Sequence, residues 1–166
     1  VGDLVDRSKE DGLNPQELLA KACEYAIQDS GIKELSNHID YVGVVRFTVD
    51  FLTATNQSNF QYSNFPRTLA NKLNISAKNE VYAPMGGNSP QVLLEDALVK
   101  ISTGETDCAL LSGGEALQTM IAKLKAGMSL DWLDEPGGSP EMIGNNDIGF
   151  SDPVSYTHLR AHETSP

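Results

Sequence analysis

The chain has 166 residues, and 23 Asp and Glu against 12 Lys and Arg give it a formal net charge of −11. This acidity argues against nonspecific nucleic-acid binding, which needs basic contacts to phosphates, and against docking on anionic lipid. No apolar run approaches the roughly 20 residues of a membrane-spanning helix, and no signal peptide is visible. Two cysteines, Cys23 and Cys108, are too few for a disulfide scaffold and lack metal-ligand spacing. A reducing cytoplasm is the simplest location.

The first predicted element is a helix that begins at residues 14–17. Their order, Asn-Pro-Gln-Glu, supplies an N-cap, a first-turn proline and a capping-box glutamate. Small and apolar residues then recur with helical spacing, and Gly31 follows where helices commonly end. Cys23 lies within this stripe, which predicts a core position rather than a reactive thiol. Before the helix, residues 1–5 resemble the end of a strand that runs into a loop.

Predicted strands then alternate with predicted helices along the chain. The strands share short β-branched or apolar runs and cover residues 39–47, 80–83 and 107–112. The helices begin with proline or follow glycine turns and cover residues 66–74, 89–104 and 115–125. A polar stretch at residues 53–63 is predicted to be a loop. This order predicts an α/β fold with a βαβαβ core, a mixed but mostly parallel sheet, and helices on both faces.

The helix at residues 89–104 follows a sharp turn. Pro90 suits its first position, with Ser89 as the N-cap before it. Gly104 follows the last apolar residue, where a helix would end. We expect this helix to bury five apolar side chains, namely Leu93, Leu94, Ala97, Leu98 and Ile101.

The character of the chain changes after residue 125. Residues 126–153 contain six acidic residues and no Lys or Arg, which is typical of a long surface loop, either functional or merely a solvated connection. Residues 154–166 resemble a sequencing adapter read through in one frame, so we expect them not to be native protein. His158 and His162 in that tail have a spacing that could hold a metal on a helix, but no metal site is predicted there.

Two glycines precede the helix at residues 89–104. Glycine lets a ligand approach the backbone closely, and amides at a helix N-terminus favour a phosphate or a developing negative charge. Such an arrangement suits an oxyanion hole, although a plain turn explains the same pattern. A phosphate-binding module of unrelated fold is a further reading, but the turn lacks a Walker-type Lys.

Residues 80–116 resemble the N-terminal half of the thiolase superfamily. Residues 103–116 match its Gly-x-x-Asp turn, apolar strand and Gly-rich turn bearing Glu. The Gly-Gly-Asn-Ser-Pro-Gln stretch at residues 86–91 is more similar to a divergent branch, usually named acetyl-CoA acetyltransferase or thiolase-like protein. Residues 1–7 and 130–132 also resemble that branch, so the resemblance extends over residues 1–150.

The resemblance implies an acyltransferase that acts on acyl-CoA thioesters, with no bound cofactor. The family's nucleophilic Cys would fall near Gly87, and neither Gly86 nor Gly87 can attack a thioester, so this chain lacks the nucleophile there. Gly87 and Asn88 are then the candidate catalytic residues, because their amides would polarise the thioester carbonyl. Gly86, Ser89 and Gln91 are the candidate substrate-binding residues. The alternative is a protein that binds acyl-CoA or acts as a scaffold without catalysis.

The resemblance also implies that residues 1–153 are part of a larger subunit. The family's catalytic His and second Cys belong to a C-terminal half, and complete members are commonly homo-oligomers. We therefore expect the isolated chain to expose a sheet edge and an apolar helix face, and to be marginally stable or prone to aggregate.

Overall fold

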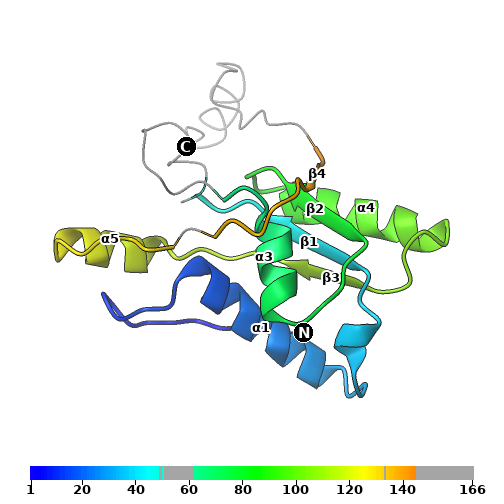
Figure 1. Cartoon of the computed structure of the whole chain (residues 1–166), viewed down its shortest axis with the longest axis horizontal. Helices are drawn as coiled ribbons and strands as arrows, with labels where there is room; N and C mark the ends of the chain where they lie inside the picture. Colours follow the sequence, from blue (N-terminus) through cyan, green and yellow to red (C-terminus); the bar gives the residue numbers. More distant parts are fainter. Residues whose placement is uncertain (49, 51–61, 133, 145–166) are drawn as a thin grey trace, which may run out of the picture.

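The computed structural model describes residues 1–48, 50, 62–132 and 134–144 (Figure 1). In this part of the chain, one sheet has the strand order β3–β1–β2–β4, and all of its pairings are parallel. The strands are β1 (Tyr41–Val45), β2 (Asn79–Ala83), β3 (Ala109–Ser112) and β4 (Glu141–Met142). The helices are α1 (Pro15–Asp29), the 3-10 turn η1 (Leu35–Asn37), α3 (Phe65–Lys72), α4 (Ser89–Ser102) and α5 (Leu117–Lys125). The predicted α/β fold is confirmed, with a fully parallel sheet in place of a mixed one.

Helices lie on both faces of the sheet, as Figure 1 shows. Successive side chains of a strand point to opposite faces, so Val42 and Val44 join one core cluster and Tyr41 joins another. The first cluster packs under α1 and α3. The second, smaller cluster packs under α4 and contains Tyr41, Val81, Ala83, Leu93 and Ala97. The predicted placement of helices on both faces is therefore confirmed.

Helix α1 begins as its sequence predicts. Asn14 Oδ1 accepts a hydrogen bond from Glu17 N at 2.8 Å, and Asn14 N donates to Glu17 Oε2 at 3.2 Å. Cys23 is 3% exposed, which confirms its core position. The expected strand end at residues 1–5 is wrong, because these residues lie outside the sheet. They run along α1, where Gly2 contacts the helix backbone too closely for any side chain.

Helix α4 departs from its prediction in two respects. Its N-cap is Asn88, and Ser89 is already the first helical residue. Leu93 and Ala97 are buried as predicted, but the expected burial of Leu94, Leu98 and Ile101 is wrong, because these side chains are exposed. Val99, for which no burial was predicted, is exposed as well. Only the row spaced four residues apart faces the sheet, since one face of a helix meets one neighbouring layer. The exposed apolar helix face expected from the sequence is thus present.

The segment after α5 is anchored to the body of the protein. Leu130 and Trp132 are buried, and Gln16 Nε2 donates a hydrogen bond to the Trp132 carbonyl at 2.7 Å. Further on, β4 pairs with β2, and Lys100 Nζ lies 2.5 Å from Glu141 Oε2. The described part of the predicted surface loop therefore contributes to the core and the sheet. The rest of that loop, the tail with its two histidines and most of the loop at residues 53–63 lie outside the described residues.

A buried carboxylate joins the strands at the amino end of the sheet. Asp40 Oδ1 accepts hydrogen bonds from the amides of Asp107 and Cys108, both at 3.1 Å, and Lys78 Nζ lies 3.3 Å from Oδ2. Burial acts to raise the pKa of Asp40, but these amides and the ammonium group together hold it below its usual value. Asp40 thus fixes β1, β2 and β3 relative to one another.

Candidate functional site

The candidate site is the turn at residues 84–88, which joins β2 to α4 at the carboxyl end of the sheet. The chain leaves β1 toward α3 on one face, and it leaves β2 toward α4 on the other (Figure 1). Neighbouring strands whose connections diverge in this way mark the place where open parallel sheets bind ligands. The residues selected from the sequence therefore lie where this topology favours a ligand.

The structure brings most of the predicted site residues to the surface of this turn. Gly86, Gly87 and Asn88 are exposed, while Ser89 is buried. Gln91 is also exposed, and its side-chain amide donates to Glu95 Oε1 at 3.2 Å. The buried serine hydroxyl lies beneath the turn, because a Cβ placed on Gly86 would come within 3.1 Å of Ser89 Oγ. Ser89 therefore supports the turn from below and does not face solvent.

Two backbone amides of the turn are free to bind a ligand. Ser89 N donates to Gly86 O at 3.1 Å, and the Asn88 carbonyl accepts from the first turn of α4. Within the described part of the chain, the amides of Gly87 and Asn88 have no hydrogen-bond acceptor. They lie at the positive end of the dipole of a 14-residue helix. The turn can therefore stabilise a partial negative charge on a carbonyl oxygen or a phosphate.

Glycine at position 87 is not required by backbone conformation. Gly87 is absent from the glycines of positive φ, and a Cβ added there would meet nothing within 4 Å. A side chain would thus fit without strain in the free protein. What glycine does at this position is leave the neighbouring amides uncovered, which suits a ligand that approaches the backbone.

No thiol or imidazole among the described residues lies at this turn. Cys23 is buried on α1, and burial raises the pKa of its thiol, although a hydrogen bond with Ser112 partly offsets this effect. Cys108 and His38 precede β3 and β1, which places them toward the opposite, amino end of the sheet. A thiolate nucleophile at the turn is therefore not supplied by the described residues.

A buried ionic cluster lies beside the turn, at the end of β1. Arg46 Nε lies 3.1 Å from Asp50 Oδ2, with an angle too bent for a hydrogen bond, and the guanidinium carbon lies 4.7 Å from the Tyr82 ring centre. Tyr82 OH donates to Asp50 Oδ2 at 2.9 Å, and Tyr62 N donates to Oδ1 at 3.0 Å. Burial raises the pKa of Asp50 despite these partners. The spacing of four between Arg46 and Asp50, directly after a strand, is the sequence signal that could have identified this cluster.

A cavity of about 600 Å³ adjoins the same end of the sheet. It lies between α1, α4 and β3, and Ala26, Leu93 and Leu111 contribute to its apolar wall. Arg46 and Glu115 line it as well. Its other lining residues include the Gly113 and Gly114 backbone and Pro90, the second residue of α4.

Comparisons with known proteins identify no relative. No family model, curated protein or solved structure matches the chain. Among the described residues, no cluster of three or more His, Cys, Asp or Glu is placed to hold a metal ion. No described helix has the length and apolar character needed to cross a membrane. The fold and the turn define an α/β protein with an exposed amide site at the carboxyl end of its sheet.

Proposed function

We propose that this chain is a thiolase-like acyltransferase that binds acyl-CoA thioesters at the turn between β2 and α4. One observation carries the proposal: the amides of Gly87 and Asn88, which have no acceptor among the described residues, lie at the N-terminus of α4 in an exposed turn. The resemblance of residues 86–91 to thiolase-like proteins supports the choice of a thioester as ligand. Gln91, exposed on the first turn of α4, would orient the ligand by hydrogen bonding.

The reaction would be acyl transfer. A nucleophilic acceptor attacks the thioester carbonyl carbon, and the carbon–sulfur bond then breaks and releases CoA as a thiolate, which takes up the proton lost by the acceptor. Negative charge develops on the carbonyl oxygen during attack, and the amides of Gly87 and Asn88 stabilise it. Removing one such donor typically lowers kcat about 10²–10³-fold.

The second candidate is acyl-CoA binding without catalysis. It is favoured by the position of the described thiols and of His38, which are buried or lie toward the other end of the sheet. Nucleophilic catalysis needs a nucleophile with an adjacent base. The same turn would then hold the thioester carbonyl without turning it over.

Asn88→Asp tests both candidates. Aspartate suits an N-cap next to the helix dipole, so the free energy of unfolding should stay the same or rise. A negative charge beside the turn should weaken acyl-CoA binding and CoA release about tenfold, which corresponds to about 1.4 kcal/mol. Asn37→Asp adds the same charge near the amino end of the sheet and should change neither acyl-CoA binding nor CoA release.

The measurements are calorimetric binding of acetyl-CoA and colorimetric detection of the released thiol. If the unaltered chain releases CoA and Asn88→Asp releases less, the acyltransferase is supported. If the unaltered chain binds acetyl-CoA without releasing CoA, and Asn88→Asp no longer binds it, the binding protein is supported. Absence of acetyl-CoA binding by the unaltered chain would overturn both candidates.

A further inference from the structure

We infer that residues 137–144, here called the edge strap, hold the β2–α4 turn in its binding shape, and that the ion pair between Lys100 and Glu141 fastens the edge strap to α4. The inference rests on the proposed function in one respect, because it takes that turn to be the ligand site. It goes further in naming a regulation of the site: docking of the edge strap and binding of the ligand stabilise each other.

The edge strap lies along β2, at the edge of the sheet opposite β3 (Figure 1). At its start, the Gly137 carbonyl accepts hydrogen bonds from Arg67 Nη1 at 3.2 Å and from Asn64 Nδ2 at 3.4 Å. Glu80 of β2 fixes both donors, because its carboxylate accepts from Arg67 Nε at 2.7 Å and from Asn64 Nδ2 at 2.9 Å. Gly138 has a positive φ, and a Cβ there would collide with Arg67 Nη1. The start of the edge strap is therefore packed against two side chains that β2 itself positions.

The middle of the edge strap is attached by few contacts. Its two ladder residues, Glu141 and Met142, are exposed, and the hydrogen bond from Ile143 N to Tyr82 O is long, at 3.4 Å. Lys100 Nζ lies 2.5 Å from Glu141 Oε2, and the Lys100 side chain is only 12% exposed. A two-residue pairing compensates little of the entropy lost in ordering the segment. The ion pair is therefore a main attachment of the edge strap to α4.

The end of the edge strap lies against the turn. A Cβ placed on Gly144 would lie 3.1 Å from two atoms of the Pro84 ring and 3.6 Å from Val92 Cγ1. Pro84 is the first residue of the turn, and Val92 belongs to the first turn of α4, so the edge strap contacts the chain on both sides of the turn. Gly87 and Asn88 remain exposed. The edge strap thus supports the turn without covering the groups that would bind a ligand.

These contacts link docking of the edge strap to binding at the turn. A ligand that requires the supported turn binds with an apparent affinity reduced to the fraction of molecules in which the edge strap is docked. Because such linkage is reciprocal, the bound ligand favours the docked edge strap by the same factor. Glu141 is then a positioning residue, which acts on the turn through Lys100 and the edge strap.

The first experiment measures amide hydrogen exchange by NMR in the absence of ligand. Glu141→Gln removes the ion pair and should speed exchange of the Ile143 amide about threefold, the factor that corresponds to about 0.6 kcal/mol. Glu135→Gln makes the same change at an exposed residue that forms no ion pair in the described part of the chain. It should leave this exchange rate unchanged. Equal rates in Glu141→Gln and the unaltered chain would overturn the role of the ion pair.

The second experiment tests the contact with the turn. Gly144 has a φ of +74°, so Gly144→Ala introduces backbone strain and presses a Cβ against Pro84. It should speed exchange of two amides in parallel about tenfold: that of Ile143, and that of Ser89, whose hydrogen bond lies within the turn. Gly127→Ala has a similar φ of +71° and no atom within 4 Å of the new Cβ, and should change neither. Amides of α1 should not change in either variant, which separates local opening from global unfolding.

The third experiment adds acetyl-CoA to the unaltered chain. At about nine times its Kd, acetyl-CoA should slow exchange of the Ile143 amide about tenfold, because a ligand that binds only the docked state multiplies the docking equilibrium constant by 1 + [L]/Kd. Acetyl-CoA that binds without slowing this exchange would overturn the inference.

The outcomes separate this inference from the proposed function. Faster exchange of the Ile143 amide in Gly144→Ala, with no change at Ser89, would show that the edge strap opens without affecting the turn and would overturn the inference. Absence of acetyl-CoA binding overturns the proposed function. The hold of the edge strap on the turn is then decided without ligand, since parallel exchange of the two amides supports it and independent exchange overturns it.

Discussion

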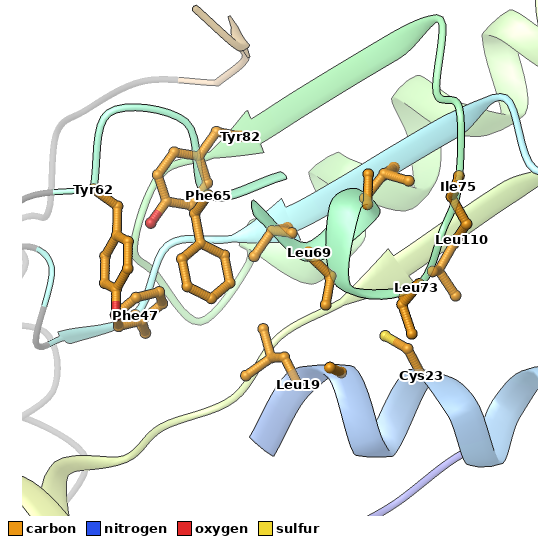
Figure 2. Packing of buried hydrophobic residues seen from close by; sticks show 14 of the residues in the cluster. Leu19, Cys23, Phe47, Tyr62, Phe65, Leu69, Leu73, Ile75, Tyr82 and Leu110 are labelled. Atoms are coloured by element: carbon orange, nitrogen blue, oxygen red, sulfur yellow. The ribbon is translucent and has the colours of Figure 1, made fainter. Parts of the chain in front are cut away.

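The two faces of the sheet differ in how completely they are covered. Under α1 and α3, Figure 2 shows a continuous layer of leucines and aromatic rings, in which Phe65 is surrounded by Phe47, Tyr62 and Tyr82 at centroid distances of 4.9, 4.8 and 6.5 Å. Under α4, the buried cluster has only five residues, and four leucine, valine and isoleucine side chains of that helix are exposed.

This difference separates stability from function. The α1/α3 face buries most of the apolar core, which is the dominant favourable contribution to folding. The α4 face has few internal contacts, but helix α4 carries the open turn at its start and borders the cavity. Substitutions on the first face should therefore act on the free energy of unfolding, and those on α4 should act on binding and association.

The largest expected effect comes from the aromatic cluster of the α1/α3 face. Phe65→Ala removes a fully buried ring and should cost about 3–5 kcal/mol of unfolding free energy, because it leaves a cavity among three aromatic neighbours. Leu98→Ala, on the outer side of α4, should cost less than about 0.5 kcal/mol. Urea unfolding followed by circular dichroism checks the pair, and similar losses in the two variants would contradict the division between the faces.

An intermediate effect is expected from Asp40, whose carboxylate joins the strands at the amino end of the sheet. Asp40→Asn should lower the unfolding free energy by about 2 kcal/mol near neutral pH, because the Asp107 and Cys108 amides and the Lys78 ammonium group lose their charged acceptor. Because the folded pKa of Asp40 lies below its ordinary value of 3.8, the stabilisation is present above that value and is lost as pH falls through the folded pKa.

The measurement is urea unfolding of the unaltered chain and of Asp40→Asn at pH 7 and at about pH 3. The difference between their free energies of unfolding should be smaller at the lower pH. Asp131→Asn, exposed in the segment after α5, is the control and should leave stability unchanged at both values. A difference for Asp40→Asn that grows on acidification would be inconsistent with the lowered pKa.

The smallest effect on stability, but a clear one on association, is expected at the outer side of α4. Leu98 is 54% exposed, so Leu98→Lys should change the unfolding free energy by less than about 0.5 kcal/mol. It should also reduce self-association, because it interrupts an exposed apolar patch. Ser102→Lys adds the same charge to the same helix without removing apolar surface and should not reduce association. Light scattering at rising concentration distinguishes the two.

Elements set by local chemistry could be predicted from the sequence. The capping box of α1, the glycine with positive φ after it, and the β-branched run of β1 follow from short-range preferences of Asn14, Gly31 and their neighbours. The alternation of strands and helices also implied parallel pairing. The turn at residues 86–88 was placed correctly for the same reason, since two glycines and a proline mark it.

Features that depend on distant partners could not be predicted. Burial of Trp132 requires Gln16, 116 residues away, and β4 is a strand only because β2 offers an open edge. The hydrogen bond from Tyr82 OH to Asp50 joins residues 32 positions apart. None of these contacts has a local pattern that could specify it alone.

The central position of β1 has a consequence for how quickly the chain folds. Tyr41 pairs with Asn79 on one side and with Ala109 on the other, so both pairings close long loops. Contacts between residues far apart in sequence slow folding, because the entropy of loop closure is lost before the contacts compensate for it. The apolar residues of β1 therefore stay exposed during folding until β2 and β3 have both paired with it. Misassembly of the chain is most favoured during that period.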